Sequence, residues 1–195
     1  MKSAADNAAS RITVELIKGI LNATRRELEA LSTRPAMSPF IREKKDFFTA
    51  ILNPAGELVV STSLTLAGNL VDAILQQYPA DTMQDGDLFW YNDPYTTGGA
   101  VSHLPDMVFV MPVFAENRLL AFIECWGHLW DIGGAVPGSI SPTASSVFQE
   151  GVMIPPVRVL HGGVRNEEVV RICLLYTSDA ADEGLGVDLG GRRII

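Results

Sequence analysis

Two histidines and one aspartate have the residue types of a metal site. His103, Asp106 and His128 would supply two imidazoles and one carboxylate, a donor set that leaves coordination positions open for water or substrate. Such a site can polarise a carbonyl group or activate a bound water molecule. The alternative is that these polar side chains only cap the ends of strands, and the residue types and spacing fit both interpretations.

A β-hairpin is the element that would bring these side chains together. Two apolar, β-rich runs, 107–114 and 118–126, are separated by the polar loop 115–117. If the turn is centred near Glu116, the residues 13 positions before it and 12 after it face each other at the open end, since both strands advance about 3.3 Å per residue. Those residues are His103 and His128. Asp106 begins the first strand at the same end, so we expect one shared site for a divalent metal ion (Mn, Fe or Zn).

Further polar residues and glycines flank this hairpin. Asp131 follows His128 by three residues and could be a fourth ligand, an acceptor that orients an imidazole, or a general base. Asp93 is the second candidate catalytic carboxylate, although an ordinary Asn-Asp-Pro turn is the alternative. The candidate substrate-binding residues are Asn92, Tyr95, Gly98, Gly99 and Arg42. For Arg42 the alternative is a solvated charged surface.

The periodicity of the remaining sequence predicts an α+β domain that is rich in sheet. One amphipathic helix should bury a stripe formed by Val14, Ile17, Leu21, Thr24, Leu28 and Leu31. The other expected elements are a hairpin over 47–52 and 57–60, a short helix over 70–78, a strand over 88–91 and a helix that starts at Glu167.

Composition narrows the class of protein. The formal net charge of −8 argues against a nucleic-acid surface, which needs clustered Lys and Arg. No apolar run approaches the roughly 20 residues that span a bilayer, and the N-terminus lacks the apolar segment of a secretory signal. The two cysteines form no disulfide framework. We therefore expect a cytoplasmic protein that binds neither nucleic acid nor membrane.

The last 23 residues break the preceding pattern. Residues 173–195 lack strand or helix periodicity and resemble the in-frame translation of a sequencing-library adapter. We expect residues 1–172 to be the N-terminal part of a longer domain, truncated at its C-terminus, and 173–195 to be a non-native tail.

Five motifs follow one another along the chain: ITVELIKGILNAT, IREKKDF, DLFWYNDPYTTGGAVSHLPD, GHLWDIGGAVPGS and FQEGVMIPPV. In this order they resemble the hydantoinase B/oxoprolinase family, whose relatives include the metal-bearing subunit of acetone carboxylase. The resemblance implies a catalytic subunit that works with a hydantoinase A-like ATPase subunit in a hetero-oligomer. The partner would use ATP to activate a small-molecule substrate. In the carboxylase relatives a His-x-x-Asp pair and a later His bind the metal, and His103, Asp106 and His128 fill those positions here.

The resemblance leaves three functions open. The first is ATP-dependent hydrolysis of a cyclic amide, such as a hydantoin or a 5-oxoproline-like lactam. The second is ATP-dependent carboxylation of a ketone, and the third is a non-catalytic assembly subunit. Two positions differ from many hydantoinase-like members: Leu129 replaces a second His after His128, and the segment 63–73 contains no His.

Overall fold

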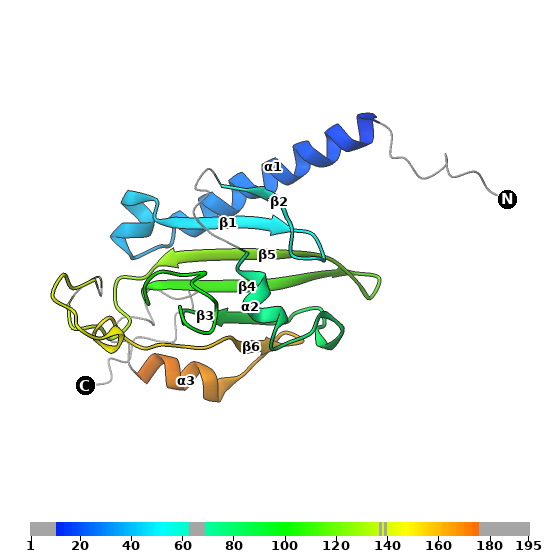
Figure 1. Cartoon of the computed structure of the whole chain (residues 1–195). Coiled ribbons are helices and arrows are strands. Elements are labelled where there is room, and N and C mark those ends of the chain that lie inside the picture. Colours follow the sequence, from blue (N-terminus) through cyan, green and yellow to red (C-terminus); the bar gives the residue numbers. More distant parts are fainter. Residues whose placement is uncertain (1–10, 63–68, 137, 139, 176–195) are drawn as a thin grey trace.

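A seven-stranded sheet in the order β2-β1-β5-β4-β3-β6-β7 forms the centre of the protein, and every neighbouring pair is antiparallel (Figure 1). The computed structural model describes residues 11–62, 69–136, 138 and 140–175. The strands are β1 (Phe47–Leu52), β2 (Leu58–Ser61), β3 (Leu88–Tyr91), β4 (Asp106–Ala115), β5 (Arg118–His128), β6 (Val157–His161) and β7 (Val164–Arg165). The helices are α1 (Arg11–Thr33), α2 (Val71–Leu75) and α3 (Glu167–Leu175), with short turns of other helix types at Phe40–Lys44, Ala80–Thr82 and Val147–Gln149. This architecture confirms the predicted sheet-rich α+β class.

The β4–β5 hairpin forms at the predicted place, but its register differs from the prediction. Glu116 and Asn117 make a two-residue turn with φ of 51° and 59°, the left-handed conformation that tight hairpins need. An irregularity between Val113 and Phe114 shifts the pairing, and His128 lies opposite Asp106. His103 therefore lies in the loop before β4 and not across from His128 in the ladder. The loop, rather than the strand register, brings its ring to the site.

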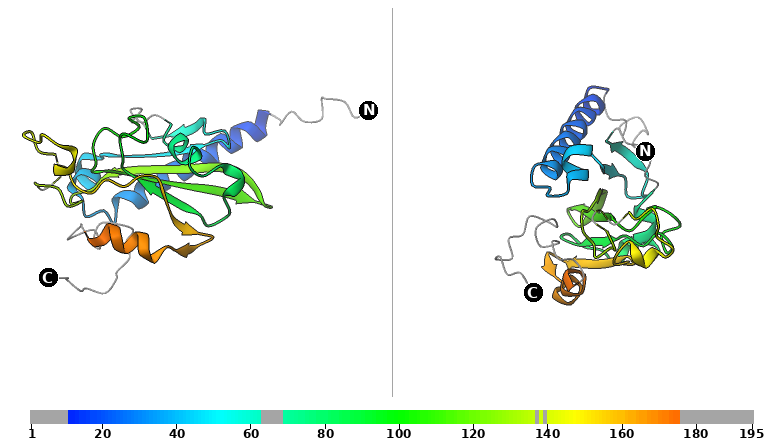
Figure 2. Two further views of the ribbon diagram at one scale, coloured as in Figure 1. Left: turned by 60° about the horizontal axis from the view of Figure 1, so that its bottom comes forward. Right: turned by 90° about the vertical axis from the view of Figure 1, so that its left-hand side faces the viewer.

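Apolar side chains cover both faces of the sheet. Alternate residues of one strand point to opposite faces, so Phe89 and Tyr91 enter one cluster while Trp90 enters the other. The first cluster packs under α2 through Leu70, Val71 and Ile74, and the second packs against α3 through Val169 and Val170. Figure 2 shows α2 and α3 on opposite sides of the sheet. The central strands therefore lie between two apolar layers.

The predicted N-terminal helix is present, but its apolar stripe is not buried as expected. None of the residues of α1 is buried, and Val14, Ile17 and Leu31 are 38%, 49% and 57% exposed. The physical reason is position: α1 runs beside β1 and β2, and its N-terminal half extends past the edge of the sheet (Figure 1). Amphipathic periodicity predicts a helix and an apolar face, but it does not say how much of that face the chain itself covers.

The other predicted elements lie close to their expected bounds. The hairpin β1–β2 and the strand β3 form as predicted, and the helix expected over 70–78 is shortened to α2. Helix α3 starts at Glu167 as expected and continues through Leu175, so the predicted domain boundary after residue 172 falls inside it. The rest of the predicted tail, 176–195, lies outside the described residues. Among the described residues, no helix combines the length and apolar character that crossing a membrane requires.

Candidate metal centre

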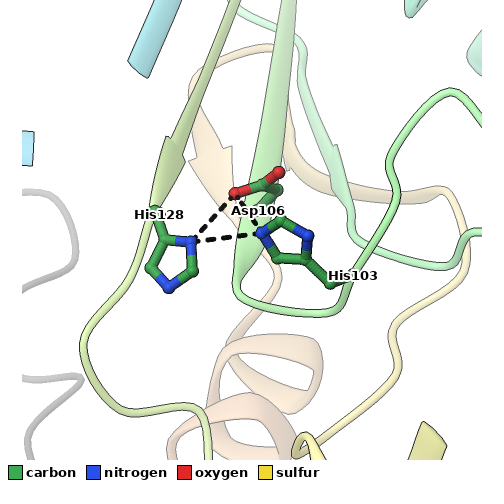
Figure 3. A group of neighbouring side chains, drawn as sticks. All are labelled: His103, Asp106 and His128. Carbon is green, nitrogen blue, oxygen red and sulfur yellow. Dashed lines mark hydrogen bonds and ion pairs between the residues drawn. The ribbon is translucent and has the colours of Figure 1, made fainter. Parts of the chain in front are cut away.

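The structure brings the side chains of His103, Asp106 and His128 together (Figure 3). His103 Nε2 lies 3.2 Å from His128 Nδ1, and Asp106 Oδ1 lies 3.3 Å from each of these nitrogens. One donor atom from each residue lies within 4.8 Å of the other two. The predicted convergence is thus confirmed, with the carboxylate supplied by the first residue of β4 and one imidazole by the last residue of β5.

Neighbouring groups orient both imidazoles. His128 Nε2 lies 3.1 Å from the carbonyl oxygen of Gly138, which accepts a hydrogen bond from the Nε2–H group, so that the Nδ1 lone pair faces the cluster. His103 Nδ1 lies 2.8 Å from the hydroxyl of Ser102, so Nε2 is the nitrogen that faces the cluster. The ring of His128 is almost fully buried, while that of His103 is 27% exposed. One side of the cluster is therefore accessible.

The charges in the cluster perturb one another. Burial raises the pKa of Asp106, but interaction with His103 and His128 outweighs burial and the net shift is downward. The pKa of His103 is raised, mainly through its interaction with the Asp106 carboxylate, which outweighs desolvation of the imidazolium. The pKa of the nearby Asp46 is also raised, by burial and then by the negative charge of Asp106. The environment of the cluster thus favours the ionised carboxylate of Asp106.

This donor set fits a divalent cation. The buried oxygen Oδ1 of Asp106 has no hydrogen-bond partner, although two ring nitrogens lie near it. With the tautomer of His128 set by the Gly138 carbonyl, the His128 Nδ1 lone pair and the Asp106 carboxylate oxygen converge beside His103 Nε2, and positive charge placed between them would be stabilised. Two imidazoles and a carboxylate suit Zn, Mn or Fe.

A segment before β1 surrounds His128. The hydroxyl of Ser38 donates to the His128 carbonyl oxygen at 2.7 Å, and the His128 N–H donates to the Asp46 carbonyl at 3.1 Å. The ring of Phe40 lies 4.3 Å from the His128 ring, centroid to centroid. The π-helical turn Phe40–Lys44 ends at Lys45, whose φ of 59° turns the chain toward Asp46. Asp46 Oδ2 then lies 3.8 Å from His128 Nδ1.

Sequence reasoning did not assign Asp46 or Phe40 to the metal site. In the sequence, Asp46 ends a run of charged residues, 42–46, that begins with Arg42. Its relevance depends on the pairing of β1 with β5, which places Phe47 opposite Gly127, next to His128. That pairing joins strands from two different hairpins, and no turn signal in the sequence specifies it. The available signal in the sequence was that the carboxylate of Asp46 comes directly before a buried strand.

Asn92 and Asp93 are buried and bonded to the chain around them. The Asn92 amide group donates to the carbonyl oxygens of Leu104 and Val152 and accepts from the Ile154 N–H. The Asp93 carboxylate accepts from the N–H groups of Tyr95 and Thr96 and from the Thr96 hydroxyl. Both side chains thus stabilise the loops that lead to His103, and neither belongs to the cluster.

The other candidate residues lie around the cluster without joining it. Tyr95 is 69% exposed, and Arg42 forms an ion pair with Glu43 at 3.4 Å. Gly98 and Gly99 have φ of 64° and 80°, and their N–H groups donate to the carbonyls of Tyr95 and Pro94. Asp131 accepts from the Gly133 N–H at 2.8 Å. Roles for these residues in catalysis or substrate binding stay predictions.

Comparison with known proteins identifies the family. The sequence profile described as Hydantoinase B/oxoprolinase matches residues 10–182. The chain is 30% identical to the caprolactamase subunit beta of Pseudomonas jessenii, over 86% of this chain and 29% of that protein. It is 29% identical to the acetophenone carboxylase delta subunit of Aromatoleum aromaticum, over 75% of this chain and 22% of that protein.

A solved structure agrees with the sequence comparison. The crystal structure of the ATP-dependent caprolactamase from Pseudomonas jessenii superposes with a TM-score of 0.71 and 28% identity, covering 88% of this chain and 30% of that chain. The present chain therefore spans less than a third of the length of these relatives. The family match covers most of the sequence, including every residue of the His-Asp-His cluster, and the chain belongs to the Hydantoinase B/oxoprolinase family.

Proposed function

We propose that this chain forms part of the metal-bearing catalytic subunit of an ATP-dependent enzyme that hydrolyses a cyclic amide. The observation that carries the proposal is the convergence of His103, Asp106 and His128, with donor atoms within 4.8 Å of one another. The identity of 30% to a caprolactamase subunit supports a cyclic amide as the substrate class. Hydantoins and 5-oxoproline-like lactams belong to the same class.

The proposed centre would be held by His103 Nε2, Asp106 Oδ1 and His128 Nδ1. A divalent ion bound there supplies Lewis acidity toward a carbonyl oxygen or a bound water molecule. The buried Asp106 carboxylate neutralises part of the ion's charge, and the carbonyl of Gly138 fixes the tautomer of His128. The half-exposed Asp46 is placed to accept a proton beside the cluster, and its raised pKa suits a general base. Asp131 remains the second candidate for this role.

The exposed side of the cluster is the expected approach for substrate. His103 is the most accessible of its three members, and the loop 92–102 leads into it. Arg42, Tyr95, Gly98 and Gly99 are the proposed contacts for a polar substrate. ATP would be used by a separate ATPase subunit, as the resemblance to the hydantoinase B/oxoprolinase family implies. The 195 residues contain no phosphate-binding loop of the Gly-x-x-x-x-Gly-Lys type, so nucleotide chemistry would lie in another chain or in a part of the protein outside them.

Ketone carboxylation is the second candidate. The chain is 29% identical to an acetophenone carboxylase subunit, close to its identity with the caprolactamase subunit. The substitution at Leu129 does not separate the two, because this side chain packs against the apolar cluster around Trp90 and Met107 and removes no donor from the His-Asp-His group. Both candidates use the same three ligands.

The test is turnover by the complete complex with its ATPase partner. Purified complex, ATP and a divalent metal are incubated with caprolactam, 5-oxoproline or a hydantoin, and in parallel with a ketone and labelled bicarbonate. We expect ATP-dependent ring opening of a cyclic amide, which His128→Ala abolishes. Label fixed from bicarbonate without ring opening would favour the carboxylase. Unchanged activity in His128→Ala would indicate a non-catalytic subunit.

A further inference from the structure

One short segment touches both the loop that carries His103 and the loop that follows His128. Residues 149–154 begin at the last residue of the 3-10 turn Val147–Gln149 and run past the end of the sheet where the cluster lies. Within this segment, Glu150 is hydrogen-bonded to Leu104, which lies 46 residues earlier in the sequence. Its side chains and backbone bond to the loop before β4 and to the loop after β5.

The contact with the His103 loop is made by Glu150. Its Oε2 accepts the N–H of Leu104, the residue that follows His103, at 3.1 Å. The carbonyl of the same Leu104 accepts from the Asn92 amide, which also bonds to Val152 and Ile154. Both backbone groups of Leu104 are therefore held by side chains, and Leu104 itself is fully buried. This fixes the backbone from which His103 projects.

The contact with the His128 loop is made by backbone groups. The Val152 N–H donates to the Ile132 carbonyl at 2.9 Å, and the Ala135 N–H donates to the Gln149 carbonyl at 2.8 Å. Gly151 permits this approach, because a Cβ at that position would lie 2.4 Å from the Ile132 carbonyl oxygen and its φ is 131°. The segment 149–154 thus joins the two loops on which the metal ligands depend.

We propose that Glu150 is a positioning residue of the metal centre, which acts by holding Leu104 so that His103 Nε2 stays in register with His128 and Asp106. The proposal rests on the proposed metal centre and adds to it a residue outside the ligand set. The hydrogen bond at the Leu104 amide carries the effect. A charge-assisted bond to a carboxylate is stronger than a neutral one, and partners of this kind affect metal affinity through ligand orientation.

Cobalt binding to the full chain tests this role. Co²⁺ is titrated into wild type, Glu150→Ala, Glu150→Asp, Glu150→Gln and the control Glu27→Ala, an exposed position in α1. Affinity comes from calorimetry, and ligand geometry comes from the visible d–d absorption. We expect Glu150→Ala to weaken Co²⁺ binding about 10- to 100-fold and to alter the absorption at saturation. Glu27→Ala should match wild type.

The other two variants separate geometry from charge and from folding. Glu150→Gln keeps an acceptor at the same reach but makes a weaker, neutral bond, so it should lose less Co²⁺ affinity than Glu150→Ala. Glu150→Asp keeps the charge but shortens the reach, so it should weaken binding even if Glu150→Ala does not fold. Wild-type affinity and absorption in both Glu150→Ala and Glu150→Asp would overturn the positioning role alone. Equal losses in Glu150→Gln and Glu150→Ala would also overturn it, whereas no binding by wild type would remove the metal centre itself.

Discussion

Asp106 and His128 are cross-strand partners at the open end of the β4–β5 hairpin, with Asp106 Oδ1 3.3 Å from His128 Nδ1. Directly opposed residues of an antiparallel pair have their side chains on the same face, so the hairpin alone brings this carboxylate to this imidazole. His103 reaches them from the preceding loop. Two of the three donors thus depend on strand register, and the third depends on loop packing.

The hydroxyl of Ser38 should matter for stability as well as for the site. Ser38 is fully buried and donates to the carbonyl oxygen of His128 at 2.7 Å. In Ser38→Ala that carbonyl loses its donor, so we expect the free energy of unfolding to fall by about 1–3 kcal/mol. Urea titration measures the change, with the exposed Ser145→Ala as control. An equal effect of the two substitutions would contradict the assigned bond.

Glu124 should make the protein less stable as pH rises. This carboxyl lies on β5 in the main apolar cluster, 1% exposed, and burial raises its pKa to about 7. The folded state therefore holds the proton more tightly than the unfolded state, whose pKa is near 4.5. Below about pH 4.5 the contribution of this group to the free energy of unfolding is fully present. It is lost as the pH rises toward about 7, by about 3 kcal/mol in total.

The substitution Glu124→Gln tests whether Glu124 lowers the stability of the protein as the pH rises. The amide is of similar size and stays neutral, so the variant should gain stability relative to wild type as pH is raised from 5 to 8. Urea unfolding at both pH values gives the difference, and comparing variants cancels the contributions of the histidines and Asp106. Glu27→Gln, on the exposed surface of α1, should show no such gain. A constant difference between wild type and Glu124→Gln at both pH values would show that burial does not perturb this carboxyl.

Apolar side chains of helices α1 and α2 differ in burial, so their substitutions should differ in their effect on stability. Ile17 in α1 is 49% exposed, whereas Ile74 in α2 is fully buried. We expect Ile74→Ala to cost about 2–5 kcal/mol of unfolding free energy and Ile17→Ala to cost within about 0.5 kcal/mol. Thermal or urea unfolding of the two variants measures both values. Similar costs would mean that the apolar stripe of α1 is packed in the isolated chain.

Local patterns in the sequence predicted the hairpin, but they did not predict the contacts between distant segments. Two apolar, β-rich runs and the polar loop 115–117 between them predict the hairpin, and with it the association of His128 and Asp106. The predicted register, with His103 opposite His128, was wrong by three positions. The turn is centred between Glu116 and Asn117, which accounts for two of them, and the irregularity between Val113 and Phe114 adds the third. Asp46 and Glu150 were missed as site residues for a related reason. Their relevance comes from pairing and hydrogen bonds across 46 residues or more, which no local pattern specifies.

The amount of bound metal shows whether His103, Asp106 and His128 hold an ion. The full chain is loaded with Zn²⁺ or Mn²⁺, dialysed, and analysed for bound metal, together with His103→Ala, Asp106→Asn, His128→Ala and the control His161→Ala. His161 lies at the far end of the sheet, beside Leu160, which pairs with Leu88. We expect about one bound ion per chain in wild type and in His161→Ala, and almost none in the three ligand variants. Metal retained at the wild-type level after loss of His128 would contradict this expectation.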